Sequence, residues 1–279
     1  MPQPSGWQAR LELEFARRGA RSLLLYRRHS GPLVVQKTLH PEGDGVCHAI
    51  IVHPPGGIAG GDHLEMQISA TNGAHALLTT PGATKWYRSR GGQSRQILHV
   101  QLAENTTLEW LPQENIVFNA AKAAISARFQ LAPGARAIGW EIVCLGRTAS
   151  DEQFTQGEIT QQTELYLDER LIWSERGRLD GDSPLLQSPA GLGGHVVYGA
   201  LWLAGLPTES PSNRILLDKL RGIHFDGGDC SVTLLPHVAV IRALAPSSEA
   251  LRAHFIRLWQ ALRPQWLGRE AIMPRIWIT

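Results

Sequence analysis

The chain has few cysteines and no long apolar run, and both shortages exclude whole classes of protein. Its three cysteines, Cys47, Cys144 and Cys230, lie far apart in 279 residues and form no C-x-x-C pair. We therefore expect neither a disulfide framework nor a thiolate zinc site, and we expect a reduced, cytoplasmic protein. Apolar runs such as 49–52 are too short to cross a bilayer, and the N-terminus has no apolar signal core. Neither a membrane span nor an export segment is expected.

An excess of charge of one sign is also missing. The 27 basic and 25 acidic side chains leave a formal net charge of +2, which gives no electrostatic reason to expect a nucleic-acid partner. With 43% hydrophobic and 19% charged residues, the composition is typical of a packed globular protein rather than a disordered chain.

The usual signatures of nucleotide binding and nucleophilic catalysis do not occur. The sequence has no G-x-G-x-x-G run, no Gly-Lys-Ser/Thr after a glycine loop and no G-x-S-x-G elbow. It has instead a glycine corner at residues 53–62, His-Pro-Pro-Gly-Gly-Ile-Ala-Gly-Gly-Asp, between two predicted strands. Such glycines permit either a tight structural turn or the close approach of a ligand, and both interpretations stay open.

Short alternating segments, separated by Gly, Pro and Asn turn signals, predict a mainly β protein. They favour a sandwich, a barrel or a solenoid over an α/β sheet, because alternating helical segments are missing. Segments of this kind include 75–79, 94–101, 125–131, 137–143, 159–167 and 171–178.

Two helices interrupt this pattern in the C-terminal part of the chain. One is predicted over 214–221 and the other over 249–262, where Leu251, Phe255 and Leu258 recur at helical spacing. Pro264 is expected to end the second helix.

Two groups of residues are candidates for contact with a metal. His40, Cys47, His48 and His53 lie close together in the sequence, but strand alternation would place Cys47 and His53 on one face and His48 on the other. This split favours ordinary structural roles for the His/Cys cluster. The second group is a scattered set of acids: Asp62, Glu109, Glu114, Glu141, Glu152, Glu164 and Glu175.

Glu109 and Glu141 stand out among these acids because their immediate neighbours are apolar. A buried carboxylate in such surroundings needs a partner or an ion. A salt bridge or a hydrogen bond would satisfy that need as well as a metal would.

Several motifs, taken in order, cover nearly the whole chain. They are Gly31-Pro32-Leu33-Val34-Val35-Gln36, His40-Pro41-Glu42, the glycine corner, 79–89 (TTPGATKWYRS), 108–114 (LEWLPQE), Leu145-Gly146-Arg147, Leu262-Arg263-Pro264 and Pro274-Arg275-Ile276-Trp277. Their order and spacing resemble the urease accessory protein family UreD, called UreH in some bacteria.

The resemblance implies a single domain over residues 1–279, mainly β, with an irregular solenoid-like or β-helix-like architecture and about two α-helices near the C-terminal part. It implies a non-catalytic assembly factor that binds apo-urease and a UreF-like protein, which in turn holds a UreG-like GTPase. A dimer of UreD–UreF–UreG units is the implied assembly. No cofactor would be permanently bound, and nickel would cross a water-filled internal path in transit.

Such a path needs weak oxygen ligands, because a tight His/Cys cage would trap a metal that stands high in the Irving–Williams series. We therefore predict that Asp62, Glu141 and Glu175 line or flank the nickel path, with Glu109 and Glu152 as further candidates. Asp62 ends the matched glycine corner. Near Glu152 the chain departs from the family pattern, because Asp151 stands where a glycine is expected before the acid.

Two other functions remain as alternatives. The chain could be a binding module that only bridges urease to UreF, with no nickel passing through it. It could also be a hydrolase with its site at the glycine corner, although the sequence offers no recognisable set of nucleophile, base and orienting group.

Overall fold

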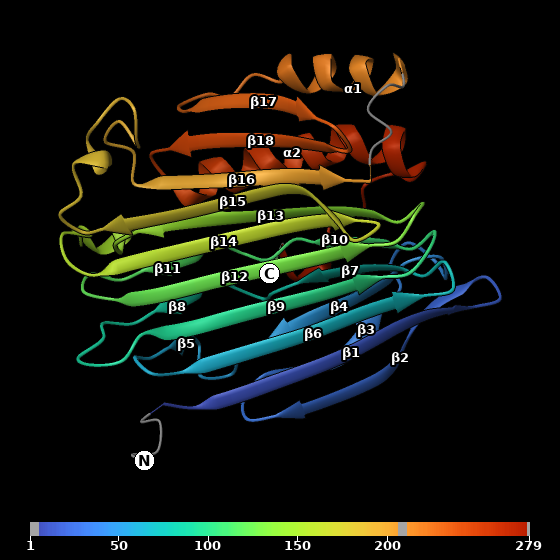
Figure 1. The fold of residues 1–279 in the computed structure, drawn as a ribbon, viewed down its shortest axis with the longest axis horizontal. Helices are drawn as coiled ribbons and strands as arrows, with labels where there is room; N and C mark the ends of the chain where they lie inside the picture. The colour runs from blue at the N-terminus through green and yellow to red at the C-terminus, as the bar shows by residue number, and fades with distance from the viewer. Residues whose placement is uncertain (1–5, 206–210, 278–279) are drawn as a thin grey trace.

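The computed structural model describes residues 6–205 and 211–277. Two β-sheets face each other, and α2 lies behind the second sheet (Figure 1). The first sheet has seven strands and the second has 11. The first sheet runs β15 (Arg170–Asp180), β14 (Glu158–Leu167), β12 (Lys122–Leu131), β9 (Ser94–Leu102), β6 (His63–Thr71), β1 (Gln8–Arg18) and β2 (Arg21–Ser30).

The second sheet has a main path and a short side branch. The main path runs β17 (Asp229–Leu235), β18 (Val238–Ala245), β16 (Val197–Ala204), β13 (Arg136–Leu145), β10 (Thr107–Trp110), β7 (His75–Thr79), β4 (Cys47–Val52) and β3 (Val34–Leu39). The branch holds β5 (Gly57–Ile58), β8 (Thr84–Trp86) and β11 (Asn115–Val117). The helices are α1 (Pro211–Arg221) and α2 (Ser248–Leu267), with single 3-10 turns at Thr148–Ser150, Pro184–Leu186 and Arg275–Trp277.

The central strands wind as a β-solenoid of about four turns. In each turn the chain passes through the second sheet, a short third side and then the first sheet; β7, β8 and β9 make one turn, and β10, β11 and β12 make the next. Equivalent strands of successive turns pair in parallel. Because the chain returns through the opposite sheet, this parallel pairing needs no crossover helix. The predicted solenoid-like β architecture with about two helices is confirmed.

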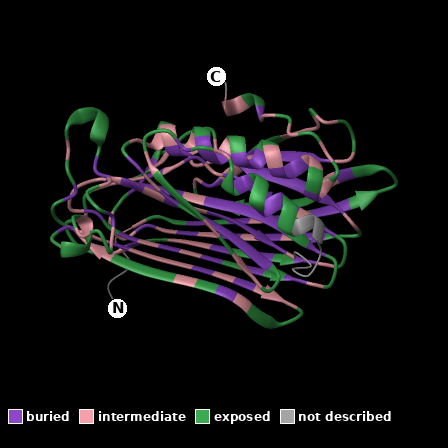
Figure 2. Cartoon of the chain, turned by 90° about the horizontal axis from the view of Figure 1, so that it is seen from above, coloured by how far each residue is buried: buried purple, intermediate pink, exposed green. Residues whose placement is uncertain are grey.

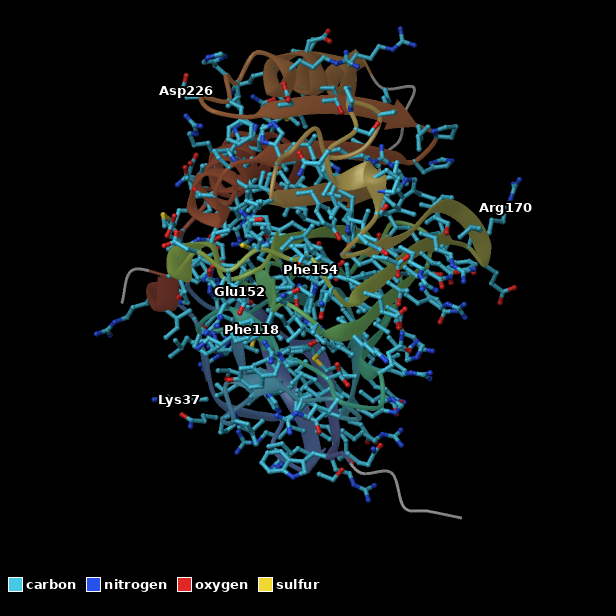
Figure 3. The ribbon with its side chains drawn as sticks, turned by 90° about the vertical axis from the view of Figure 1, so that its left-hand side faces the viewer. Lys37, Phe118, Glu152, Phe154, Arg170 and Asp226 are labelled. Carbon is cyan, nitrogen blue, oxygen red and sulfur yellow. The ribbon has the colours of Figure 1, made fainter. Side chains whose placement is uncertain are left out.

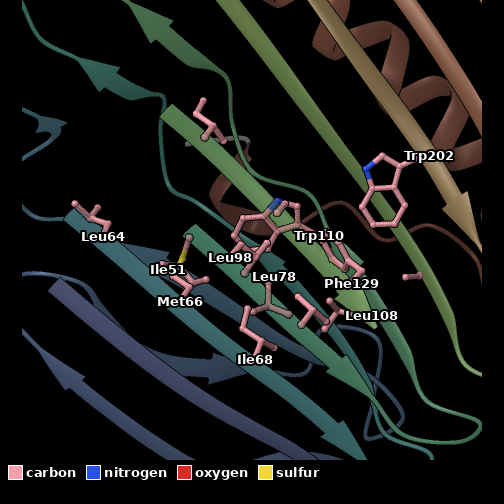
Figure 4. Packing of buried hydrophobic residues seen from close by; sticks show 14 of the residues in the cluster. Ile51, Leu64, Met66, Ile68, Leu78, Leu98, Leu108, Trp110, Phe129 and Trp202 are labelled. Carbon is pink, nitrogen blue, oxygen red and sulfur yellow. The ribbon is translucent and has the colours of Figure 1, made fainter. Parts of the chain in front are cut away.

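The inner faces of the two sheets form the larger hydrophobic core. Leu64, Met66 and Ile68 alternate along β6 and point inward, where they meet Leu98 of β9 and Trp110 of β10 (Figure 4). The outer face of the first sheet is largely polar, so the buried residues concentrate between the sheets and beneath the helices (Figure 2). This alternation is the period-two pattern that the sequence shows.

A second hydrophobic cluster joins the outer face of the second sheet to the helices. Leu251, Phe255, Leu258 and Leu262 of α2 are fully buried in it, as their helical spacing predicts. Among the described residues, no helix combines the length and the apolar character that a membrane span requires.

The expected end of α2 at Pro264 is wrong, because the helix continues to Leu267 and ends at Gly268. Gly268 adopts the left-handed conformation (φ 66°), and its N–H donates to the carbonyl of Pro264. Proline removes one amide donor and strains one turn, but it does not prevent a buried helix from extending by a few residues.

Candidate cation passage between the sheets

A cavity of about 670 Å³ lies between the two sheets. Residues of β14 and β15 line one wall, residues of β13, β16, β17 and β18 line the opposite wall, and the 185–192 loop closes one side. Small residues keep this space open. Gly177 lies on the β15 wall, where an added side-chain carbon would meet nothing within 4 Å, and Ala200 lies on the β16 wall.

A second cavity of about 250 Å³ lies beside the glycine corner. His53, Gly56 and Gly57 contribute to its wall. The linings of the two cavities share one residue, Glu141. Its carboxylate therefore stands where a route from the glycine corner would enter the larger cavity.

Glu141 interrupts a strand that is otherwise buried along nearly its whole length. From Ala137 to Leu145 every residue of β13 is buried except Glu141, which is half-buried at the cavity wall. Its Oε2 accepts a hydrogen bond of 3.2 Å from the side-chain amide of Gln161, and the Tyr198 hydroxyl donates to the carbonyl oxygen of that same side chain. None of the ion pairs found in the described part of the chain includes Glu141.

The environment of Glu141 favours its neutral form. Burial raises the pKa of Glu141 to about 7; the hydrogen bond from Gln161 opposes this rise, and the charge of Glu175 adds to it. A carboxyl group whose pKa is near 7 is present in both its protonated and its charged form at cellular pH, so it can take up or release a proton at the cavity wall. Perturbed groups of this kind concentrate at functional sites.

Glu175 lies on the β15 side of the same cavity, and its charge is paired with that of an arginine. Both of its oxygens accept hydrogen bonds from Arg242 of β18, at 3.1 Å from Nε and 3.0 Å from Nη2. The two side chains are 39% and 45% exposed, which places this pair at the solvent-facing mouth of the cavity. The structure thus brings together Glu141 and Glu175, two of the three principal residues that the sequence suggested.

Asp62 has its carboxylate occupied within the glycine corner. Its Oδ1 accepts from the amide of Trp7 (2.7 Å) and its Oδ2 from the amide of Ala59 (2.8 Å). It is buried and lines neither of the two cavities. These bonds close the turn and fix the start of β1, while Gly56 and Gly57 face the smaller cavity. The role of Asp62 in nickel transfer stays a prediction.

Glu109 is fully buried on the other face of the second sheet, against α2. It accepts hydrogen bonds from His75 (2.6 Å), Trp259 (2.6 Å) and Arg263 (3.0 Å). Burial alone would raise the pKa of Glu109, but His75 and Arg263 together lower it to about 2. Arg263 also binds Glu42 at 2.8 Å. The network satisfies this carboxylate with protein donors, away from both cavities.

Glu152 lines a third cavity, of about 660 Å³, which shares no lining residue with the larger and smaller cavities described above. It pairs with Arg147 at 2.7 Å and accepts from the amide of Asn119 at 2.9 Å. Burial opposes its charged form, but Arg147 and the Asn119 amide hold its pKa below the usual value. The Arg147 guanidinium lies 4.8 Å from the centre of the Phe118 ring, and Glu152 and Phe118 lie close together in Figure 3. Its part in a nickel route stays a prediction.

The His/Cys cluster is divided between opposite faces, as strand alternation predicts. Cys47 points into the core between the sheets, and His53 lines the smaller cavity. His48 instead pairs with Glu42 at 2.6 Å on the helix side. Within the described ranges no group of three or more His, Cys, Asp and Glu side chains is arranged to hold a metal ion.

Sequence reasoning missed the residues that define the surroundings of these acids: Gln161, Tyr198, Arg242 and Arg263. One signal was present for the first of them. Ile159, Gln161 and Thr163 alternate on the inward face of β14, so polar side chains stand at positions where a closed core would have apolar ones. No sequence signal pairs Arg242 with Glu175, because they are 67 residues apart.

Comparison with known proteins places the chain in a family. The sequence model described as "UreD urease accessory protein" matches residues 8–278. A "Urease accessory protein UreD" of Dechloromonas aromatica is 48% identical over 274 residues, covering 98% of this chain and 95% of the relative. One from a Pseudomonas fluorescens strain is 50% identical with the same coverage, and one from an Azoarcus species is 46% identical with the same coverage. The chain therefore belongs to the UreD family of urease accessory proteins.

Proposed function

We propose that this protein passes nickel through the space between its two sheets during the maturation of urease. The observation that carries the proposal is Glu141, a carboxylate without an ion-pair partner among the described residues, at the wall shared by both cavities. The chain belongs to a family of urease accessory proteins, and nickel is the cargo that this proposal assigns to it.

The chemistry of the cavity walls supports transit rather than storage. The larger cavity offers carboxylate, amide and hydroxyl oxygens, from Glu141, Gln161, Thr163 and Tyr198. It also holds the Cys230 thiol, whose pKa burial raises to about 11, so that it is protonated at neutral pH. Nickel(II) binds imidazole and thiolate ligands more tightly than isolated oxygen ligands, so a route lined mainly by oxygen donors lets the ion leave again. Passage would involve exchange of water and carboxylate ligands, with no bond of the protein made or broken.

The proposed partners follow from the family. In this proposal the protein binds apo-urease and a UreF-like protein, reaches a UreG-like GTPase through the latter, and works as a dimer of UreD–UreF–UreG units in the cytoplasm. It is a non-catalytic metallochaperone, binds nickel only transiently, and has neither a nucleic-acid nor a membrane partner.

The test is co-expression of urease and its accessory proteins with Glu141→Gln or Glu175→Gln variants of this chain. We expect both variants to copurify with apo-urease and the UreF-like protein, while the nickel content of urease falls severalfold. Glu164→Gln is the matched control, because Glu164 pairs with Arg128 on the outer face of the first sheet and should leave nickel content unchanged.

One alternative function predicts a different result. If the protein only bridges urease to its partners, both cavity variants will support full nickel loading as long as the complex forms. Full loading by both variants would therefore reject passage in favour of bridging.

A further inference from the structure

Arg242, the arginine that pairs with Glu175, has a position that the proposed function does not explain. Pairing within the second sheet places Glu141, Ala200, Arg242 and Ser231 in one row across β13, β16, β18 and β17. Adjacent strands lie about 4.8 Å apart, so Glu141 and Arg242 are separated by roughly 10 Å, with only the methyl group of Ala200 between them. All four residues line the larger cavity.

Glu141 and Glu175, two of the three acids that line this cavity, are unequally neutralised. Arg242 holds both oxygens of Glu175 in a bidentate pair, the strongest geometry available to a guanidinium and a carboxylate. Glu141 receives one amide hydrogen bond, and no Lys, Arg or His within the described ranges forms an ion pair with it. Arg176 and Arg178 also line the cavity, but among the described residues only Arg242 forms an ion pair with either of these two acids.

A divalent cation that uses both acids has to compete with this arginine. The guanidinium occupies the oxygens of Glu175 that the cation would bind, and it also repels the cation. Arg242 is nearly half exposed, so its side chain can move into solvent without leaving a buried charge unpaired.

We propose that Arg242 is a built-in competitor for the cation, so that a divalent ion enters the cavity mouth by exchange with the guanidinium at Glu175. The inference rests on the proposed function, because it assigns a regulator to the same passage. Competition of this kind weakens the hold on the ion and keeps it in transit. It also favours doubly charged ions, because a singly charged ion gains less from displacing another single charge.

The test is calorimetric titration of Ni²⁺ into the purified chain and its Arg242→Gln variant. Removing the competing charge should tighten nickel binding by about fivefold to tenfold at low ionic strength. Arg242→Met keeps the apolar stem and carries the same expectation if the glutamine variant does not fold. An unchanged or weaker affinity in the variant that folds, or no measurable binding in any of them, overturns the inference.

Two controls separate charge competition from a general effect of losing an arginine. Arg242→Lys keeps the charge and should bind nickel within about twofold of the unaltered chain. Arg178→Gln removes an arginine that also lines the cavity but pairs with Glu158 and Asp180, so it should not change the affinity. If the nickel affinity of the Arg178→Gln variant rose as much as that of the Arg242→Gln variant, a specific role for Arg242 would be contradicted.

Failure of this inference differs from failure of the proposed function. If nickel passage is wrong, Glu141→Gln and Glu175→Gln leave the nickel content of urease unchanged. If only the competition is wrong, those two variants lower nickel content while Arg242→Gln leaves the calorimetric affinity unchanged.

Discussion

Glu109 and Glu141 show how the same side chain serves two purposes on opposite faces of one sheet. Three donor residues surround Glu109, and two of them, His75 and Arg263, lower its pKa to about 2 against the effect of burial. Glu141 has one amide donor at the edge of a cavity, and burial raises its pKa to about 7. One carboxylate therefore stabilises the fold near neutral pH, and the other destabilises it.

Replacing Glu141 by glutamine should stabilise the protein at pH 8. The pKa of Glu141 is about 7 in the folded protein, against an ordinary value of 4.5, so the unfolded chain loses its proton first as the pH rises. The contribution of protonated Glu141 to the free energy of unfolding is therefore fully present below pH 4.5 and is lost as the pH rises from 4.5 to 7. The Glu141→Gln variant avoids this loss and should gain about 2–3 kcal/mol at pH 8 relative to its effect at pH 4. Urea unfolding at the two pH values measures the difference; equal effects at both would contradict it.

Replacing Glu109 by glutamine should instead lower the free energy of unfolding. Its folded pKa of about 2 lies below the ordinary 4.5, so its contribution is present above pH 4.5 and disappears as the pH falls to about 2. Glu109→Gln also leaves part of the charge of buried Arg263 uncompensated. We expect a loss of about 3–5 kcal/mol at pH 7, again measured by urea unfolding. A loss below about 1 kcal/mol would show that the network contributes little.

The sequence could not distinguish these two acids. Each has apolar neighbours, Leu108 and Trp110 around Glu109 and Trp140 and Ile142 around Glu141. The difference comes from distant residues: Arg263 is 154 positions from Glu109. Local sequence indicates that a buried carboxylate needs a partner, and only the fold supplies that partner.

At the scale of elements, α2 packs closely against the second sheet where a strand lacks a side chain. A carbon added at Gly199 of β16 would lie 3.1 Å from the side chains of Leu251 and Phe255, and 2.7 Å from the Glu141 carbonyl oxygen. The helix therefore rests on a strand position that only glycine fits without displacement.

Gly199→Ala should destabilise the protein by about 1–3 kcal/mol, because an overpacked contact forces the helix or the strand to shift. Gly177→Ala is the control, since a carbon at that position meets nothing within 4 Å; it should change the free energy of unfolding by less than about 0.5 kcal/mol. Thermal unfolding of both variants checks the pair. Equal destabilisation would mean that the contact with α2 is not responsible.

The elements themselves were largely predictable. Strands expected over 159–167 and 171–178 occur as Glu158–Leu167 and Arg170–Asp180, because alternation and turn residues are local signals. The end of α2 was not predictable from Pro264, because packing of Trp266 onto the second cluster supports a further turn.

At the scale of the whole molecule, the motifs that resemble UreD indicated the solenoid-like fold, whereas residue patterns alone left sandwich, barrel and solenoid open. The turns of the solenoid are not visible as a repeat in the sequence because they differ in length. Paired positions of successive turns show this: His63 pairs with Arg95, Ser94 with Ala123, and Lys122 with Glu158. The cavity was not predictable either, because it depends on which small residues of opposite sheets meet.

The most direct test of passage between the sheets is to obstruct it without removing any of its polar groups. Ala200 lies on the cavity wall between Glu141 and Arg242, so Ala200→Phe places a ring in the proposed route, and Ala200→Ser serves as the size-matched control. The measurement is nickel per urease active site after co-expression, with copurification of the accessory complex confirmed for each variant. Passage between the sheets predicts nickel-poor urease with Ala200→Phe and normal loading with Ala200→Ser. Full nickel loading by an Ala200→Phe protein that still forms the complex would contradict it.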